Sequence, residues 1–287
     1  MMKEISVVIP SFNGKDLLEK NLPQVILACP GCEIIVVDDG STDESVNFLK
    51  AKFPQIKLVE HKKNLRFARV CNSGFKKAEG KIVILLNNDV SPEKDFLKPL
   101  IENFKDKIVF SVGCQEIEEK EGKKVISGRN EAEFKRGFLV HKRSKDQTKK
   151  DTYWTFGGSM AVDREKYFKL GGMDSIFKPA YWEDIDLCFR ARKKGFKILF
   201  EPKSVVYHNH ETTNLKELGK IRMEIAAYKN QILFVWKNIR GVKLLEHFMW
   251  LPYHLIFTTI RSKGMFFIGF LWALSSLPKL FFRKRRI

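Results

Sequence analysis

Acidic and amide side chains cluster at three places in the chain where chemistry is expected. Asp38-Asp39 and Asn87-Asn88-Asp89 each follow an apolar run, and Trp182-Glu183-Asp184 precedes an amphipathic stretch. Carboxylate and amide oxygens suit a hard divalent cation, and a carboxylate can take a proton from a hydroxyl group. Both roles have structural alternatives, since Asp89 can cap a helix and neighbouring acids favour the N-terminal end of a helix.

Short apolar runs that alternate with helical stretches would position the first two clusters. The strand-like runs are Ile5–Ile9, Glu33–Val37, Ile56–Glu60 and Lys81–Leu86. Their alternation with helices predicts right-handed βαβ units and a mainly parallel sheet. Ligands bind at the carboxyl ends of strands in such sheets, so we expect the polar residues that follow these runs to line one crevice.

The rest of the first 237 residues gives a less regular pattern. The charge-rich stretch from Glu116 to Lys150 predicts a mobile excursion over the crevice, and Trp154–Val162 is strand-like with Gly157-Gly158 inside it. Residues 183–194 form an amphipathic helical pattern, because apolar side chains recur along one side. Two short strands at 197–201 and 204–207 and a helix from about 215 to 237 are expected to follow.

Composition narrows the class of protein. The 287 residues are 44% hydrophobic and carry a formal charge of +18, which predicts one large α/β domain with an appendage and an anionic partner. The basic residues are spread along the chain without a recognised nucleic-acid-binding motif, so we expect no nucleic acid as partner. Cys29 and Cys32 have the spacing of a redox dithiol, but reduced structural thiols explain all five cysteines more simply. The N-terminus lacks an apolar signal-peptide core, which predicts a cytoplasmic catalytic part.

The segment from Val242 to Phe282 is dense in aromatic and aliphatic residues. Charged residues and Pro252 interrupt it, so it falls short of the ~20 apolar residues of a spanning helix. A basic cluster, Arg283–Arg286, follows. This combination favours helices that lie in the interface of an anionic membrane, and the alternative is a helical hairpin packed on the catalytic domain or on a second copy. We therefore divide the chain into a catalytic domain, residues 1–212, and a helical, membrane-associated region, residues 213–287.

The order of several motifs resembles the inverting glycosyltransferases of family 2, which have a Rossmann-like GT-A fold. The resemblance runs from about Ile5 to His210 and depends on the joint order of its blocks. They are Val8–Asn13, Ile35–Asp43, Leu85–Asp89, Gly157–Met160, Leu170–Asp174, Trp182–Leu187 and Pro202–His208. It implies an α/β nucleotide-sugar-binding fold with the C-terminal helical segment appended.

The resemblance also implies roles for the residues of the crevice. Asp39 would accept a hydrogen bond from uracil or thymine, and Asp89, with His208, would bind Mg²⁺ or Mn²⁺ at the diphosphate. Arg66 stands where many relatives have glycine, and it could bind a phosphate or indicate that the loop runs differently. The nucleotide sugar would contact Pro10, Phe12, Asn13, Asp39, Arg66, Asn87, Asn88, Gly157 and Gly158.

The resemblance also implies which residues carry out the transfer reaction and which substrates they act on. Asp184, beside Glu183, matches the base that deprotonates the acceptor hydroxyl, and Trp182 and Asp186 would contact the acceptor. Asn87-Asn88-Asp89 resembles rhamnosyltransferase-like bacterial members, which favours dTDP-rhamnose among UDP- and dTDP-sugar donors. The acceptor would be a cell-envelope glycan or a lipid-linked glycan at the cytoplasmic face of the membrane.

Two other classes of protein share parts of this pattern. A processive polysaccharide synthase would carry several spanning helices and a Gln-x-x-Arg-Trp motif, and the sequence has neither. A non-catalytic glycan-binding or scaffold protein on the same fold would be expected to lack Asp184 or Asp89, and both are present. The sequence leaves the oligomeric state open, and a homo-oligomer is compatible with it.

Overall fold

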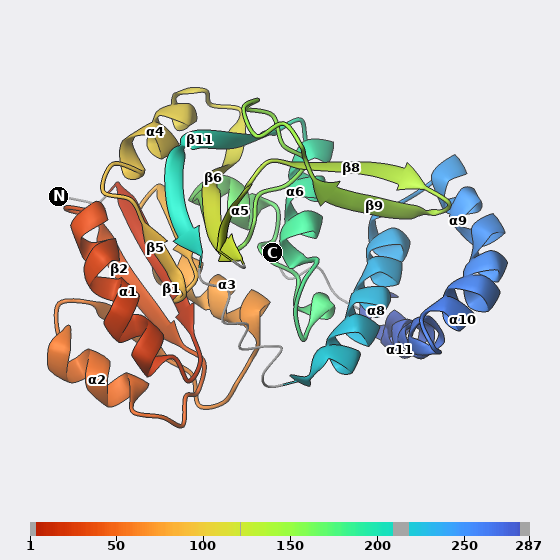
Figure 1. Cartoon of the computed structure of the whole chain (residues 1–287), viewed down its shortest axis with the longest axis horizontal. Coiled ribbons are helices and arrows are strands. Elements are labelled where there is room, and N and C mark those ends of the chain that lie inside the picture. The colour runs from red at the N-terminus through yellow and green to blue at the C-terminus, as the bar shows by residue number, and fades with distance from the viewer. Residues whose placement is uncertain (1–3, 121, 209–217, 282–287) are drawn as a thin grey trace.

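The computed structural model of the chain describes residues 4–120, 122–208 and 218–281 (Figure 1). Its centre is a nine-stranded sheet in the order β3-β2-β1-β4-β10-β6-β11-β5, with β7 paired to β6. A second sheet consists of β8 and β9.

The first half of the large sheet is parallel, as the alternating pattern predicts. It contains β1 (Ile5–Ser11), β2 (Glu33–Asp38), β3 (Lys57–Glu60) and β4 (Ile82–Leu86). Continuous apolar runs form these strands because both of their faces are covered by helices. The carboxyl ends of β1, β2 and β4 meet at one edge, which brings Phe12, Asp39 and Asn87 together although they are far apart in sequence.

The second half of the sheet is mixed rather than parallel. β10 (Ser159–Asp163) is antiparallel to both β4 and β6 (Val109–Lys120), and β11 (Lys197–His208) is parallel to β6. β5 (Val90–Pro92) and β7 (Lys123–Ser127) are antiparallel edge strands. Hairpins instead of a crossover helix join β6 to β10, and antiparallel neighbours need no crossover. β11 is one strand with an irregular register, where the sequence indicated two.

Helices cover both faces of the sheet and create two hydrophobic cores. Val7 and Ile9 of β1 belong to the core that contains side chains of α1 (Lys15–Ala28), α2 (Ser45–Lys52) and α4 (Leu97–Glu102). Val8 faces the other core, with α3 (Phe67–Lys77), α5 (Arg164–Lys169), α6 (Glu183–Lys193) and α8 (Lys220–Asn238). This alternation along a strand gives the layered arrangement of an α/β domain. All five cysteines are free, and four of them are buried.

The stretch from 116 to 150 is built of strands, which corrects the expectation of a mobile excursion. β8 (Asn130–Lys135) and β9 (Phe138–Arg143) form a hairpin whose residues Phe138 and Leu139 are buried. The charged residues that suggested mobility lie largely on the exposed side of these strands. The hairpin extends from the catalytic part toward the C-terminal helices (Figure 1).

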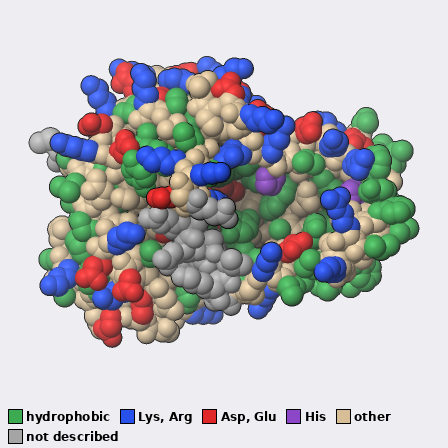
Figure 2. Space-filling view, in the orientation of Figure 1, with side chains coloured by type: hydrophobic (Ala, Val, Ile, Leu, Met, Phe, Trp, Pro, Cys, Tyr) green, Lys and Arg blue, Asp and Glu red, His purple; other side chains and the backbone are tan. Residues whose placement is uncertain are grey.

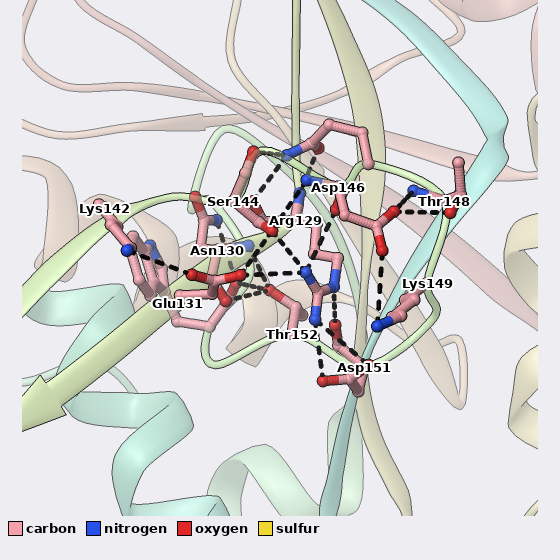
Figure 3. Close-up of polar contacts among 12 residues, drawn as sticks. Arg129, Asn130, Glu131, Lys142, Ser144, Asp146, Thr148, Lys149, Asp151 and Thr152 are labelled. Atoms are coloured by element: carbon pink, nitrogen blue, oxygen red, sulfur yellow. Dashed lines mark hydrogen bonds and ion pairs between the residues drawn. The ribbon is translucent and has the colours of Figure 1, made fainter.

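A buried arginine anchors the base of this hairpin (Figure 3). Arg129 donates from Nε to the Asp151 carbonyl at 2.8 Å and from Nη1 to the Ser144 hydroxyl and the Asp146 carbonyl. Its Nη2 lies 3.2 Å from an Asp151 carboxylate oxygen. One guanidinium group thus joins three segments that carry few apolar side chains.

The C-terminal region consists of α8, α9 (Val242–Tyr253), the π-helical η3 (His254–Thr258), α10 (Thr259–Arg261) and α11 (Met265–Phe281). α11 packs along α8, and the turn of the β8–β9 hairpin contacts His247 of α9. None of the helices in the described residues is long and apolar enough to cross a membrane. The expected domain boundary at 212–213 and the basic cluster 283–286 lie outside the described residues.

Arg129→Met should lower the free energy of unfolding by about 2 kcal/mol, because it leaves buried acceptors without their donor. Chemical denaturation of the purified chain measures this change. Arg143→Met is the matched control, since that exposed arginine makes one 3.4 Å contact with the Ile126 carbonyl. Equal stability of the two variants would show that the Arg129 network does not hold the hairpin.

Candidate functional site

A cavity of about 550 Å³ opens at the carboxyl ends of β1, β2 and β4. Its volume is within the range of sites that enclose small ligands. The residues predicted from the sequence line it except Asn13 and Asp186. The predicted residues that do line it are Pro10, Phe12, Asp39, Arg66, Asn87, Asn88, Asp89, Gly157, Gly158, Trp182, Glu183, Asp184 and His208.

Asp39 lies at one end of the cavity and is almost fully buried. Its Oδ1 accepts a hydrogen bond from the Leu65 amide at 2.8 Å and lies 3.0 Å from His61 Nδ1. Its Oδ2 accepts from the Arg66 amide at 2.9 Å. These bonds fix the carboxylate at the cavity wall, where remaining acceptor capacity can face a ligand donor.

Arg66 has an unusual backbone conformation, with φ of 74° and ψ of 160°. That region is essentially restricted to glycine, and a side chain there costs on the order of 1–3 kcal/mol. A glycine would adopt this backbone conformation without that cost. The strain is accepted at a residue whose guanidinium group can bind an anion.

Asp89, His208 and Glu116 form a buried row between β4 and β11. His208 Nε2 lies 3.2 Å from Asp89 Oδ1, and its Nδ1 lies 3.3 Å from Glu116 Oε1. Burial alone would lower the pKa of His208, but hydrogen bonding to Asp89 and Glu116 and their negative charges raise it to about 10. Two carboxylates that attract a proton so strongly also provide a favourable potential for a divalent cation.

The spacing of this row suits a cation. Two ligands at right angles and about 2.1 Å from one ion lie about 3.0 Å apart, close to the separation of Asp89 Oδ1 and His208 Nε2. Glu116 would then hold the other ring nitrogen of His208, as outer carboxylates do in metal sites. Among the described residues no three His, Cys, Asp or Glu side chains form a complete metal-binding group. Water molecules or oxygens of a substrate would complete the coordination.

Asn87, Asn88 and Gly158 shape the middle of the cavity. The backbone amide of Asn87 donates to the Gly158 carbonyl at 2.9 Å. A Cβ on Gly158 would lie 2.5 Å from the side-chain nitrogen of Asn87. Glycine is required there because the two segments touch. Asn88 Nδ2 donates to Ser11 Oγ at 3.1 Å and thereby links the ends of β4 and β1.

Two adjacent carboxyl groups, those of Glu183 and Asp184, line the cavity at the start of α6. Asp184 Oδ2 accepts from the Gly157 amide at 3.2 Å, and Oδ1 accepts from the Ile185 amide at 2.8 Å. Burial raises the pKa of Asp184. Burial and the charge of Asp184 raise the pKa of Glu183 to about 8. Each of the two carboxyl groups therefore holds its proton to a higher pH than an isolated carboxyl group in water does.

Asn13 and Asp186, for which ligand contacts are also predicted, do not line the cavity and make contacts within the protein. The Asn13 side chain accepts a hydrogen bond from the Thr42 amide at 2.7 Å and ties the β1 loop to the β2 loop. Asp186 is fully buried and binds Arg190, Lys237 and Asn238. Burial raises the pKa of Asp186, but the charges of Arg190 and Lys237 outweigh this effect and lower it.

Several cavity residues were not identified from the sequence. Glu116 and His141 lie in the stretch that was interpreted as mobile, and Tyr181 precedes the Trp182 motif. Phe67, Trp154 and Phe156 add aromatic surface to the cavity. The apolar run that precedes Glu116 in β6 was an available signal, because polar residues at strand ends had already marked the other clusters.

The fold and this crevice are those of a glycosyltransferase of the GT-A class. The solved structure of GalNAc-T7 with UDP, GalNAc and Mn²⁺ superposes with a TM-score of 0.69, covering 97% of this chain and 58% of that one. The sequence identity is 18%, so this likeness concerns the fold. The family model for glycosyl transferase family 2 matches residues 6–171, which is more than half of the chain. The chain belongs to glycosyl transferase family 2.

Named relatives extend this relationship. The pre-mycofactocin glycosyltransferase of Mycobacterium tuberculosis is 26% identical over 212 residues, which cover 73% of this chain and 43% of the relative. The dolichol-phosphate mannosyltransferase of Pyrococcus furiosus is 29% identical over 117 residues, covering 39% of this chain and 33% of the relative. The aligned segments span less than half the length of either relative.

The raised pKa of Glu183 has a consequence for stability. Its pKa moves from 4.5 to about 8 on folding, so folding favours the protonated form. The resulting stabilisation is present below pH 4.5 and is lost as the pH rises through 8. Glu183→Gln cannot ionise, and its free energy of unfolding should decline less across this range than that of the wild type.

Thermal or chemical denaturation at several pH values in metal-free buffer measures this difference. Glu102→Gln, at an exposed carboxylate on α4, is the control and should follow the wild-type curve. Parallel curves for wild type and Glu183→Gln would contradict a raised pKa of Glu183.

Proposed function

We propose that the chain is an inverting glycosyltransferase that moves a sugar from a UDP- or dTDP-sugar to a hydroxyl group of a glycan or lipid-linked acceptor. The observation that carries this proposal is the position of Asp184. Its partly exposed carboxylate lines the same cavity as Asp39 and Asp89, and burial raises its pKa. A base in that position can act on an acceptor while the nucleotide occupies the far end.

The nucleotide would bind at the ends of β1 and β2. Asp39 is an acceptor for the imide N–H of uracil or thymine, and Phe12 and Pro10 supply apolar surface for the base. Arg66, held at the start of α3, would contact the diphosphate. Solved structures with a similar fold hold UDP in one case and GDP-mannose in another, so the proposed uridine or thymidine donor depends on Asp39 itself. The resemblance of Asn87-Asn88-Asp89 to rhamnosyltransferases favours dTDP-rhamnose.

Asp89 and His208 would hold Mg²⁺ or Mn²⁺, with Glu116 orienting His208. A divalent cation neutralises the charge that develops on the diphosphate as it leaves. Asp89 lies in the loop directly before β5 and His208 ends β11, the neighbour of β5, so the carboxylate and the imidazole would hold the cation from two adjacent segments. The Mn²⁺ in the GalNAc-T7 structure supports the same requirement in this chain.

The transfer itself would be a single displacement. The Asp184 carboxylate takes the proton of the acceptor hydroxyl as its oxygen bonds to the anomeric carbon. The bond between that carbon and the diphosphate oxygen breaks on the opposite face, which inverts the anomeric configuration. Protonated Glu183 adds no second negative charge next to the base, and Trp182 would contact the acceptor.

Asp184→Asn should reduce kcat by roughly 10³-fold, because the amide cannot accept the proton. Product formation from a panel of UDP-, dTDP- and GDP-sugars with Mg²⁺ or Mn²⁺ measures it. Asp106→Asn is the control, since that exposed carboxylate pairs with Lys197 outside the cavity. Absence of turnover with every donor, for the wild type as well, would favour the alternative of a non-catalytic glycan-binding or scaffold protein.

The C-terminal helices would attach the chain to the cytoplasmic face of an anionic membrane. Twelve of the twenty large hydrophobic side chains exposed in the described residues lie between Val242 and Leu274. Figure 2 shows hydrophobic side chains gathered at the end of the molecule where α9 to α11 lie in Figure 1. Between 240 and 281 the sequence has five Lys and Arg residues and only one acid, Glu246. An apolar surface with basic residues around it suits an interface with anionic head groups.

The triple substitution Leu245→Glu, Met249→Glu and Ile260→Glu should abolish binding to vesicles that contain phosphatidylglycerol. These side chains are 64%, 80% and 72% exposed, so the fold should survive their replacement. Vesicle flotation measures binding, and Leu27→Glu on α1, 69% exposed, is the control. Unchanged flotation of the triple variant would rule out this surface as the membrane contact.

A further inference from the structure

The segment from Asp174 to Asp186 carries the carboxylates of the site in an unusual conformation. Tyr181 and Trp182 both have positive φ, at 70° and 82°. Non-glycine residues in the left-handed region cost free energy and persist where neighbouring structure enforces them. These two residues immediately precede Glu183 and Asp184, so their conformation sets the direction in which α6 starts and its first side chains point.

Asn230 of α8 supplies the enforcing contact. Its side chain is fully buried, and its Nδ2 lies 2.5 Å from the Phe177 carbonyl oxygen and 3.0 Å from those of Ala180 and Tyr181. One amide group therefore binds three carbonyls of the segment. Its Oδ1 is buried without a hydrogen-bond partner in the described structure. A buried acceptor without a partner is costly, so the value of an asparagine here lies in donation.

Neighbouring residues of α8 reinforce the same segment. Lys229 Nζ donates to the Lys178 carbonyl at 2.5 Å, and its side chain is almost fully buried. Eight residues further along the helix, Lys237 binds both Asp174 and Asp186 at the two ends of the segment. Because eight residues rise about 12 Å, α8 holds the segment along its length and not at one point.

α11 in turn holds α8 in place. The Lys229 ammonium lies 4.6 Å from the centre of the Trp272 ring. The two helices approach closely at Gly269, where a Cβ would lie 2.8 Å from the Cβ of Tyr228. The C-terminal helices are therefore attached to the site through the helix that contacts the catalytic segment.

We propose that Asn230 is a positioning residue of the transfer reaction, which fixes the left-handed Tyr181-Trp182 conformation and thereby aims Asp184 at the cavity. The residue touches neither substrate nor the reacting atoms and acts through the segment. Its effect is on the acceptor side of the cavity, because Asn230 makes no hydrogen bond to the ends of β1, β2 or β4 in the described structure. This inference depends on the proposed function for its kinetic consequence.

Asn230→Leu keeps the side-chain size and removes the donors. It should lower kcat roughly 100-fold, the loss expected when a reacting group is displaced by about 1 Å. The KM for the donor and the Kd for UDP should stay at wild-type values. Hydrogen–deuterium exchange should accelerate in peptides that cover 177–184 and stay unchanged in β1 and β4. Asn230→Ser, which keeps one donor, should show a smaller loss and provides the measurement if the leucine variant fails to fold.

Gln231→Leu is the matched control. The glutamine is next to Asn230 on the same helix and donates to the Leu139 carbonyl of β9 at 3.3 Å, away from the segment. It should leave kcat and the exchange of 177–184 unchanged. The proposal is overturned if both Asn230 variants keep wild-type kcat and exchange, or if kcat and UDP binding fall together. If the wild type turns over no nucleotide sugar, the proposed function fails, and the exchange measurement alone decides whether Asn230 holds the segment.

Discussion

The site depends on holding two adjacent carboxyl groups, a buried one and a half-buried one, at the start of one helix. Burial of Glu183 and Asp184 raises the pKa of both, which opposes the charged form that a base must have. Backbone amides of Gly157 and Ile185 donate to Asp184 and partly offset that cost. The amino end of α6 adds the favourable side of the helix dipole. The surrounding structure must therefore hold the two backbone amides, the start of α6 and the segment before it in fixed positions next to the cavity.

Asp184 and Asp186 show how strongly position decides chemistry within one helix. The two aspartates are two residues apart, yet the pKa of the partly exposed Asp184 is raised and that of the fully buried Asp186 is lowered. The difference arises because Lys237 and Arg190 neutralise the charge of Asp186. Asp184 lines the cavity instead. The first aspartate is available to a substrate, and the second joins α6 to α8. The C-terminal region is thus part of the architecture of the site as well as a candidate membrane contact.

The sequence predicted the fold and most of the cavity for a physical reason. Buried parallel strands are continuous apolar runs, and polar residues at their carboxyl ends necessarily converge on one edge. Prediction from the sequence failed where contacts between segments that are distant in the chain determine the structure. The Arg129 network and the β8–β9 hairpin were read as mobile because charge dominates that stretch, and Glu116 was missed with them. The contacts of Asp186 could not be anticipated either. Of the two cations that neutralise it, Lys237 lies 51 residues further along the chain, and Arg190 lies on the next turn of α6.

Arg66 illustrates the same limit at the nucleotide end. Its φ of 74° lies in a region that favours glycine, and the residue type alone gives no indication of this conformation. The central claim is a single displacement at the anomeric carbon with Asp184 as base, and product stereochemistry tests it most directly. Proton NMR of the product formed from a donor of known anomeric configuration should show inversion at that carbon. Retention of configuration would contradict the assignment of Asp184 and require a covalent intermediate or another mechanism.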